Sequence, residues 1–337
     1  MQDFFKKAFT MRASSIGDAL MGKYFLENLH SAHPSANLYM IAGSRGGMIR
    51  DLLAGYPWLK VLEANRHSPT SLMRVWKELV GTDLALTQPA ENPFSLPSKF
   101  FARLVSKKLV GFEDGSRWNF LYDILVQFDG EEKSDGMILE EQKALRAAGV
   151  PIGFRDLTLS YLADPGVLAR CHLAKKEYVL VHLFSGNDGR SISQKKRIEI
   201  VRALREALPE IHLVLTGGPE DAARAGEAAA GLPNVVNLAG RTSIQELINL
   251  IARARSTLAL DTGAAHIAAH LRAPLCVLTR KAARHAWWGE PMYQNRPTVL
   301  CNEAADDSAP RFERCPPSLE TIDLSTIVDK VAKLCVP

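Results

Sequence analysis

A small-residue turn that carries one carboxylate lies near the start of the chain. Residues 14–18 read SSIGD, and they follow an apolar segment that suits a strand and precede one that suits a helix. At such a turn Asp18 could take a proton from an attacking hydroxyl group, which is general-base chemistry. Asp18 or Ser15 would serve equally well as a simple helix cap. On spacing alone, the helix cap is the favoured interpretation.

A second polar turn lies in residues 258–266, which read LALDTGAAH. A strand would end at Asp261 and a helix would begin two or three residues later. Thr262 and Gly263 would then present backbone N–H groups at a helix N-terminus, where the helix dipole favours an anion such as a diphosphate. His266 lies one turn further on and could reach the same anion. The alternative is an Asp or Thr cap beside an ordinary buried histidine.

Three further loops could complete a nucleotide site. The glycine-rich loop at residues 184–190 (FSGNDGR) contains Ser185 and Arg190, and such loops cradle phosphates. Glu220, in TGGPE, could accept hydrogen bonds from ribose hydroxyl groups, or it could simply begin a helix. Thr242 could line a base pocket, although Thr242 or Ser243 also suits an N-cap. None of these loops is a GxGxxG or Walker sequence, so no motif assigns NAD or ATP.

The elements that hold these turns follow an alternating pattern in the second half. Apolar strands are predicted at residues 178–183, 211–216, 235–238, 257–260 and 275–278. Helices are predicted between them, at residues 193–208, 220–230, 243–253 and 264–271. Strands that alternate with helices over short connections indicate a parallel, doubly wound sheet.

The first half repeats this pattern less regularly. Strands are predicted at residues 5–11, 38–42, 60–63, 84–87 and 121–126, and helices at 19–30, 48–54, 71–80 and 136–148. The proline-rich residues 88–97 are expected to be irregular. We therefore expect an α/β fold of two Rossmann-like domains, residues 1–160 and 161–337, with a hinge between residues 153 and 176. The last helix, residues 325–334, is a candidate to return to the first domain.

Composition limits the class of protein. A chain of 337 residues suits two domains, and 47% hydrophobic and 23% charged residues are typical of a globular protein. No apolar run reaches the ~18 residues that span a bilayer, and the first ten residues do not form a signal peptide. We expect a soluble, cytoplasmic protein. Five cysteines without a CxxC pair argue against a disulfide framework and a zinc site.

Charge is unevenly distributed along the chain. The net charge of +4 is too small to indicate a nucleic-acid-binding protein. Residues 1–117, however, hold 15 Lys and Arg against 10 Asp and Glu. Such a basic region could steer an anionic acceptor or contact anionic lipid headgroups, although scattered arginines are also common on solvated surfaces. The candidates for acceptor binding are Arg12, Arg45, Arg50, Arg66 and Arg74.

These segments together resemble glycosyltransferase family 9, the heptosyltransferase-like enzymes with the GT-B fold. The segment SSIGDALMGKYFLENL resembles the opening signature of the family. The segment LALDTGAAHIAAHLRAPLCVLT resembles its most diagnostic stretch, and LTGGPED, LAGRTSIQEL and Trp288-Gly289 follow in family order. The resemblance covers nearly the whole chain and implies two Rossmann-like domains that face a cleft.

The resemblance also implies roles for individual residues. Asp18 would deprotonate the acceptor hydroxyl group, and Asp261 would contact the donor sugar. Thr262, Gly263 and His266 would bind the donor diphosphate. By the same resemblance, Glu220 would bind the ribose and Thr242 would lie beside the base. The family inverts the anomeric centre without a metal, so no metal and no cofactor is expected, and the donor is expected to be ADP-linked.

One segment departs from the family pattern. Family members commonly have a Lys followed by Trp-Pro after the first phosphate loop, where this chain has Arg190-Ser191-Ile192-Ser193. Arg190 could replace that Lys, but Arg and Lys bind phosphate differently. The donor could therefore differ from ADP-heptose.

The sequence thus favours an inverting glycosyltransferase. Its expected substrates are a nucleotide sugar, with heptose as the expected sugar, and an anionic glycan or glycolipid acceptor such as the lipopolysaccharide inner core. Peripheral contact with the inner membrane would accompany such an acceptor. Two alternatives are a nucleotide-sugar isomerase or epimerase on the same fold, and a nucleotide-sugar-binding protein without turnover.

Overall fold

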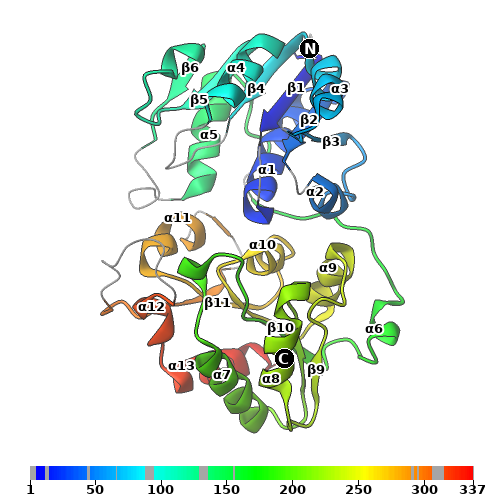
Figure 1. Cartoon of the computed structure of the whole chain (residues 1–337), viewed down its shortest axis with the longest axis vertical. Coiled ribbons are helices and arrows are strands. Elements are labelled where there is room, and N and C mark those ends of the chain that lie inside the picture. The colour runs from blue at the N-terminus through cyan, green and yellow to red at the C-terminus, as the bar shows by residue number, and fades with distance from the viewer. Residues whose placement is uncertain are drawn as a thin grey trace. The chain divides into compact units, whose positions relative to one another are not determined.

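The chain forms two compact units, each built on its own parallel sheet (Figure 1). The first unit comprises Met1–Ser160 and His285–Gln294, and the second comprises Tyr161–Arg284 and Asn295–Pro337. Within these ranges the computed structural model describes residues 5–11, 15–43, 46–65, 67–87, 95–128, 136–154, 156–289, 292–293, 296–305 and 315–336.

The described residues of the first unit contain a six-stranded parallel sheet with the strand order β3-β2-β1-β4-β5-β6. Its strands are β1 (Lys7–Met11), β2 (Asn37–Ala42), β3 (Leu59–Glu63), β4 (Thr82–Leu86), β5 (Ser106–Phe112) and β6 (Ile124–Val126). Its helices are α1 (Ile16–Ala32), α2 (Gly46–Leu52), α3 (Pro69–Leu79), α4 (Leu96–Val105) and α5 (Met137–Ala148), and a short 3-10 helix, η1 (Asn119–Leu121), precedes β6. A parallel sheet needs a crossover between successive strands, and these helices supply it.

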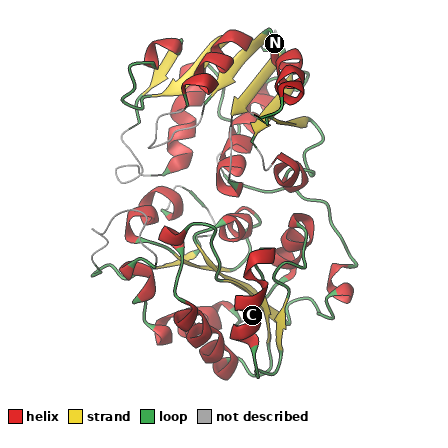
Figure 2. Cartoon of the chain, in the orientation of Figure 1, coloured by secondary structure: helices red, strands yellow, loops and turns green. Residues whose placement is uncertain are grey.

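Helices lie on both sides of each sheet (Figure 2). In the first unit, α3 and α4 bury Val75, Leu79, Ala102 and Val105 against strand residues such as Phe9. Helices α1 and α5 contact each other on the opposite face. The sheet is therefore covered on both faces, as apolar parallel strands require.

Helix α4 and strand β5 were not predicted, and for α4 the reason lies in a proline. Residues 88–97 were expected to be irregular throughout, but α4 begins at Leu96, with Pro97 in its first turn. Proline is tolerated there because the first N–H groups of a helix have no carbonyl partner within the helix. The predicted strand at residues 121–126 is correspondingly short, because Asn119–Leu121 forms η1 and only Ile124–Val126 is strand.

The second unit repeats the topology of the first. Its described strands are β7 (Tyr178–His182), β8 (His212–Leu215), β9 (Val235–Asn237), β10 (Ser256–Leu260), β11 (Leu275–Leu278) and β12 (Thr298–Leu300), in the order β12-β11-β10-β7-β8-β9. Its helices are α6 (Val167–Arg170), α7 (Gln194–Ala207), α8 (Ala222–Ala229), α9 (Ile244–Arg253), α10 (Gly263–His270), α12 (Pro317–Glu320) and α13 (Leu324–Leu334), while α11 (Arg284–Trp288) crosses the boundary between the units. In each sheet the strand order therefore reverses between the first and the fourth strand of the unit. Open α/β sheets bind ligands at this point.

The last helix belongs to the second unit. Helix α13 contacts α7 and β10, and Ile327 and Val331 are fully buried in the core of that unit. The suggestion that this helix returns to the first domain is therefore wrong. Its apolar stripe is buried against α7, β10 and β11, all of which belong to the second unit.

A late segment of the chain completes the first unit instead. Residues His285–Gln294 group with that unit, and the described side chains of Trp288, Met292 and Tyr293 are buried. The rings of Trp288 and Tyr293 stack with their centroids 5.6 Å apart. The backbone N–H of Ile138, at the start of α5, donates to Met292 Sδ at 3.2 Å.

The segment that leads out of the first unit is fixed to α1 as far as Ser160. Asn28 Oδ1 accepts hydrogen bonds from the N–H groups of Gly153 and Phe154, at 2.8 and 2.9 Å. The Ser160 N–H donates to Tyr56 Oη at 2.8 Å. Lys23, fully buried, pairs with Glu27 at 2.7 Å and also donates to the Thr158 carbonyl, while burial lowers its pKa. The boundary at Ser160 thus coincides with the end of this network.

Candidate functional site

The start of α10 holds a buried carboxylate at the switch point of the second sheet. Asp261 directly follows β10 and is 2% exposed. Its Oδ2 accepts a hydrogen bond from Thr279 Oγ1 at 3.3 Å. Its Oδ1 is buried without a hydrogen-bond partner in the described part of the chain. Because a buried carboxylate oxygen is costly to leave unsatisfied, Asp261 is suited to accept a hydrogen bond from a bound hydroxyl group.

The N-terminus of α10 has no side-chain cap. Thr262 occupies the N-cap position with extended backbone angles, but its side chain makes no capping hydrogen bond. Its hydroxyl group donates instead to the Leu260 carbonyl at 3.2 Å. The first N–H groups of a helix have no carbonyl partner within it. Those of Gly263 and the next residues are therefore positioned for an anion, which the helix dipole also favours.

His266 lies one turn into α10, beside Asp261. Its Nε2 is 3.6 Å from Asp261 Oδ1, and the residue is 5% exposed. His270 Nδ1 lies 2.7 Å from the His266 carbonyl oxygen, and since a carbonyl can only accept, that nitrogen carries the proton. The structure therefore brings together Asp261, Thr262, Gly263 and His266, as the sequence predicted for this turn.

The loop after β7 reaches the neighbouring position on the same sheet edge, because β7 pairs with β10 in parallel. Ser185 Oγ accepts a hydrogen bond from the Asn187 N–H at 3.1 Å, and the Arg190 N–H donates to the Asn187 carbonyl at 3.0 Å. The Arg190 Nε is buried and has no hydrogen-bond partner among the described residues. That nitrogen is thus available to donate a hydrogen bond to a bound phosphate.

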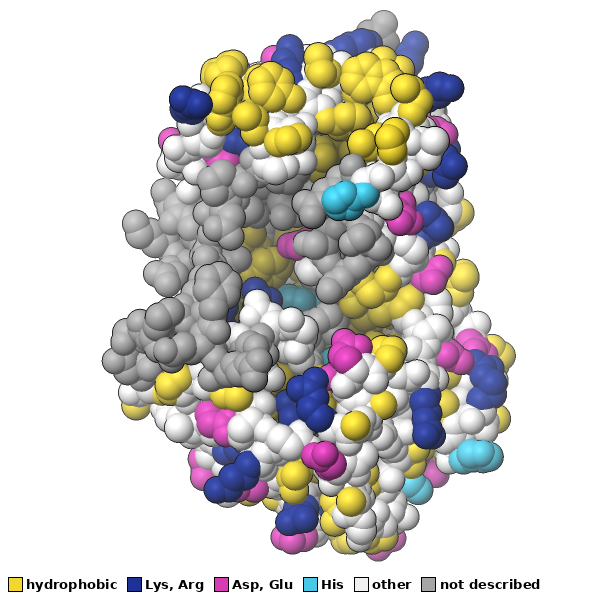
Figure 3. All heavy atoms as spheres, in the orientation of Figure 1, with side chains coloured by type: hydrophobic (Ala, Val, Ile, Leu, Met, Phe, Trp, Pro, Cys, Tyr) yellow, Lys and Arg dark blue, Asp and Glu magenta, His cyan; other side chains and the backbone are white. Residues whose placement is uncertain are grey.

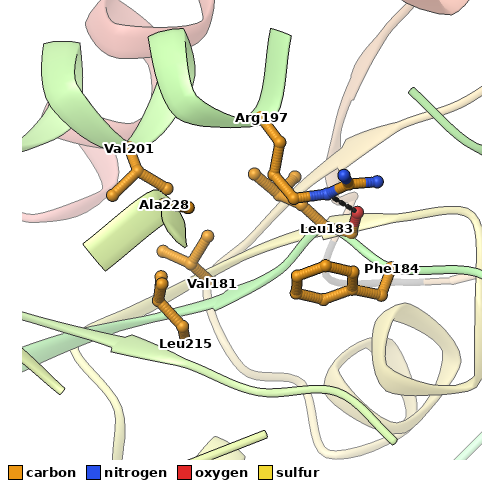
Figure 4. A pocket seen from close by; sticks show the side chains of 7 residues that line it. All are labelled: Val181, Leu183, Phe184, Arg197, Val201, Leu215 and Ala228. Atoms are coloured by element: carbon orange, nitrogen blue, oxygen red, sulfur yellow. Dashed lines mark hydrogen bonds between the residues drawn. The ribbon is translucent and has the colours of Figure 1, made fainter. Parts of the chain in front are cut away.

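Arg197 holds both ends of this loop. The side chain lies in a small apolar pocket between α7, α8 and the strands, where it points toward the Leu183 carbonyl (Figure 4). Its Nε donates to that carbonyl at 2.9 Å, and a terminal nitrogen donates to the Ile192 carbonyl at 3.0 Å. The guanidinium carbon is 4.5 Å from the centroid of the Phe184 ring. The pocket is lined almost entirely by apolar side chains, so we assign it to the core and Arg197 to positioning the loop.

The N-terminus of α7, unlike that of α10, is occupied by the protein itself. The Ser193 side chain caps α7 by accepting the Lys196 N–H at 3.1 Å. Glu320, from α12, accepts the Ser193 N–H at 2.9 Å and also the Ser193 hydroxyl group. A carboxylate of the protein itself therefore already lies at the start of α7.

Glu220 and Thr242 lie in loops that touch each other at the ends of β8 and β9. The Gly240 N–H donates to the Gly217 carbonyl at 3.0 Å. Gly240 has a φ of +71°, and a Cβ there would lie 2.8 Å from the Pro219 Cα, so only glycine fits. The Glu220 side chain is exposed and makes no hydrogen bond in the described residues. Ser243, with Glu246 in a capping box, caps α9, so Thr242 is not needed as the cap.

His182 ends β7 and was not singled out in the sequence. Its Nδ1 lies 3.0 Å from Thr216 Oγ1, at the end of β8. Burial lowers the pKa of His182 to about 4, so the ring is neutral at physiological pH. A neutral ring at this edge can exchange hydrogen bonds with a ligand without repelling or attracting charge.

In the first unit, Ser15 and Asp18 share two hydrogen bonds at the start of α1. Ser15 is the N-cap, and its Oγ accepts the Asp18 N–H at 3.0 Å. The Ser15 hydroxyl group donates to Asp18 Oδ2 at 2.7 Å. The cap is therefore Ser15, and the half-buried Asp18 carboxylate keeps an oxygen for another partner. The turn lies at the end of β1, beside β4, at the switch point of this sheet.

The candidate acceptor arginines are only partly described. Arg12, Arg45 and Arg66 lie outside the described residues. Arg50 is exposed in α2, and Arg74 is exposed in the middle of α3. Neither forms an ion pair with another described residue, and the structure does not bring these two arginines together at one place.

Two signals in the sequence could have identified the missed residues. Arg197 lies on the apolar stripe of its helix, three and four residues before Ile200 and Val201, and a charged residue at such a position needs internal partners. His182 ends the otherwise apolar strand YVLVH. The role of Glu320 has no local signal, because it acts on a residue 127 positions away.

Within the described ranges, no three His, Cys, Asp or Glu side chains group as a metal site would require. The described helices are also too short or too polar to cross a bilayer.

Comparison with known proteins gives consistent matches in family and in fold. The family described as glycosyltransferase family 9 (heptosyltransferase) matches residues 74–316. A search of curated proteins found no match.

Solved structures match over nearly the whole chain. The E. coli ADP-heptose lipopolysaccharide heptosyltransferase II is 18% identical, with a TM-score of 0.74, and the match covers 98% of each chain. A family 9 glycosyltransferase from Veillonella parvula is 15% identical, with a TM-score of 0.75 over 99% of this chain and 98% of that one. E. coli heptosyltransferase WaaC with ADP-2-deoxy-2-fluoro heptose is 16% identical, with a TM-score of 0.69 over 97% of this chain and 99% of that one. The predicted architecture of two Rossmann-like sheets is confirmed.

Proposed function

The chain belongs to glycosyltransferase family 9, the heptosyltransferase family, and we propose that it transfers heptose from an ADP-linked donor to an anionic glycan with inversion at the anomeric carbon. It is a glycosyltransferase of the GT-B fold that uses a nucleotide-sugar donor. One observation carries the proposal for the donor site. At the uncapped N-terminus of α10, the buried Asp261 has an oxygen without a hydrogen-bond partner in the described residues.

We propose that the second unit binds the donor along one sheet edge. The diphosphate would lie on the N–H groups of Gly263 and the next residue, with Thr262, His266 and Arg190 beside it. Asp261 would accept a hydrogen bond from a sugar hydroxyl group. In the transferase reaction the diphosphate leaves with a developing negative charge, and oriented N–H groups and an arginine stabilise such a charge without a metal ion. We propose that the reaction is metal-independent on this ground.

Around the nucleoside we propose a second group of contacts. Ser185 would face the phosphates from the loop after β7. Glu220, exposed and without a hydrogen-bond partner among the described residues, would bind the ribose hydroxyl groups. Thr242, which is not required as a helix cap, would lie beside the base.

Asp18 is the proposed general base. The carboxylate would remove the proton from the acceptor hydroxyl group as that oxygen attacks the anomeric carbon from the face opposite the diphosphate. The Ser15 hydroxyl group holds Oδ2 at 2.7 Å, which orients the carboxylate and leaves Oδ1 to take the proton.

The acceptor is proposed to be an anionic glycolipid such as the lipopolysaccharide inner core. Arg12, Arg45, Arg50, Arg66 and Arg74 would contribute to its binding, and the protein would act in the cytoplasm at the inner face of the inner membrane. The local excess of positive charge in residues 1–117 supports this proposal.

A transfer assay tests the proposal directly. The purified chain is mixed with ADP-heptose and a heptose-free inner-core acceptor, and the anomeric configuration of the product is read by NMR. ADP-glucose and UDP-sugars serve as donor controls, since Arg190 replaces the family Lys. Full activity with EDTA is expected. Product formed from donor alone would instead indicate an isomerase, and donor binding without product under all conditions would indicate a binding protein.

A further inference from the structure

Exposed apolar side chains gather on the α3–α4 side of the first unit. In Figure 3 hydrophobic side chains cover much of the visible surface of this unit, with Lys and Arg side chains around them. The exposed fractions are 56% for Met73, 41% for Phe100, 67% for Leu104 and 71% for Phe120. A folded chain rarely leaves such residues together in water unless the surface has a partner.

Helix α4 is apolar on two opposite faces. One face buries Ala102 and Val105 against the sheet. Phe100 and Leu104 are four residues apart and therefore lie one above the other on the outer face. Packing of α4 on the sheet does not require apolar residues on its outer face. Their presence indicates that this face contacts a second apolar surface.

Aromatic contacts connect α3 to α4 and α4 to the segment at η1. The Trp76 and Phe101 rings join α3 to α4, with centroids 6.0 Å apart. Phe100 is 6.0 Å from Trp118, which is 5.8 Å from Phe120. We call Met73, Phe100, Leu104, Trp118 and Phe120 the apolar patch.

A buried ion pair holds the η1 side of the patch in place. Lys99 Nζ pairs with Asp114 at 2.7 Å, and both side chains are almost fully buried. The same nitrogen lies 3.4 Å from Asn119 Oδ1 and 5.2 Å from the centroid of the Tyr122 ring. The segment that carries Trp118 and Phe120 is thus fixed on α4 before any partner arrives.

Cations without acidic partners flank the apolar patch, whereas most nearby carboxylates are neutralised. Lys77 of α3 and Arg117 form no ion pair with a described residue, and the Arg117 guanidinium carbon lies 4.8 Å from the Trp118 ring centroid. By contrast, Asp83 pairs with Lys107 at 2.8 Å and Asp123 pairs with Arg103 at 3.3 Å. The outward charge near the patch is therefore positive.

We infer that the apolar patch, with Lys77 and Arg117, docks this protein on the surface of an anionic lipid bilayer. Phenylalanine, leucine and tryptophan enter the boundary between headgroups and acyl chains, and the two cations meet lipid phosphates. This combination distinguishes a bilayer from an apolar protein partner, which would not need unpaired cations at the rim. The inference rests on the membrane contact proposed above and assigns it a surface.

Vesicle co-sedimentation tests the inference with the full chain. The wild-type protein is expected to bind phosphatidylcholine vesicles that contain phosphatidylglycerol, and to bind less without it or in high salt. The double variant Phe100→Ser/Leu104→Ser should lose affinity by at least about tenfold, since each buried side chain favours the bound state by a comparable factor. Lys77→Gln and Arg117→Gln should each lower affinity roughly fivefold on the anionic vesicles.

Matched changes on the second unit are the controls. Val336, 71% exposed, and Lys195, with its side chain 88% exposed, are changed to Val336→Ser and Lys195→Gln, and neither should alter binding. Equal thermal unfolding temperatures will show that the patch variants fold, and transfer to a lipid-free acceptor should stay at the wild-type level in all of them.

Three outcomes would overturn the inference. If the wild-type chain stays in the supernatant, the membrane contact and the surface both fall, although the transfer reaction stands on its own assay. If the patch variants bind like wild type, the contact stands but another surface makes it. If the wild-type chain instead forms dimers that Phe100→Ser/Leu104→Ser abolishes, the patch is an interface between two copies.

Discussion

The starts of α1 and α10 occupy equivalent places, each after a strand at a switch point, but they are prepared for opposite charges. At α1 the protein supplies its own cap, Ser15, and presents the Asp18 carboxylate. At α10 the cap position is filled by Thr262 without a capping bond, so the N–H groups face outward. One helix start can hold a proton, and the other can hold an anion.

A third helix start shows that the opening at α10 is specific. The N-terminus of α7 follows the glycine-rich loop, yet Ser193 and Glu320 fill it. Loop composition alone would have favoured α7 as the phosphate site. If the proposed site at α10 is correct, the unsatisfied N–H groups of a helix start indicate an anion site better than the number of glycines before it does.

The largest expected effect is on turnover. Asp18→Asn should lower kcat by about 10²–10⁴-fold, because the amide cannot take the acceptor proton. Donor affinity, measured by calorimetry, should not change, since donor binding is assigned to α10. A variant with near wild-type kcat would show that Asp18 only takes part in capping α1. The start of α1 would then have no catalytic role to set against that of α10.

The next effect is on donor binding. His266→Ala and Arg190→Ala should each weaken binding of a nucleoside diphosphate by ~1–3 kcal/mol, through loss of a charged or buried hydrogen bond. Glu320→Gln is the matched control at α7, where stability should fall but affinity should remain. Unchanged affinity in both His266→Ala and Arg190→Ala, or a large loss in Glu320→Gln, would contradict a phosphate site at the start of α10.

A smaller effect should show whether the Ser15 hydroxyl group orients the Asp18 carboxylate for catalysis. Ser15→Ala removes the hydrogen bond to Asp18 Oδ2 and should lower kcat roughly tenfold, as expected for a bond to a charged group. It should also lower the free energy of unfolding by about 1 kcal/mol through loss of the cap. Ser15→Thr should restore both, because threonine can cap and donate. If Ser15→Ala changes stability alone, the hydroxyl group serves only the helix.

The smallest effect concerns pH. The pKa of His182 is about 4 in the folded chain and near 6.5 when unfolded, so the unfolded chain binds the proton more tightly. The contribution to stability is complete above pH ~6.5 and declines as the pH falls toward 4, with about 1 kcal/mol lost near pH 5.5. The free energies of unfolding of wild type and His182→Gln, measured with denaturant, should converge as the pH falls from 6.5 toward 4. Parallel curves would show that His182 is not buried as described.

Much of the second unit could be predicted because its segments are regular and its polar turns follow strand ends. The segment LALDTGAAH positioned Asp261 and His266 correctly, since a strand, a turn and a helix follow each other locally. Helix α4 was missed because a proline at a first turn looks like a proline in a loop. Arg197 and Glu320 act through contacts with backbone groups that only the folded chain brings near. The apolar stripe of α7 could have indicated that Arg197 needs internal partners, but not which partners they are, and Glu320 has no local signal at all.

The placement of residues 285–294 has a consequence for how the chain is made. Synthesis runs from the N-terminus, and domains generally fold as they emerge. The first unit, however, includes Trp288, Met292 and Tyr293, all buried, and Met292 meets the first turn of α5. Its sheet can form early, but the region beside Ile138 must wait until strands β7 to β11 of the second unit have been translated. The unit that emerges first from the ribosome is therefore complete only after most of the second unit has been synthesised.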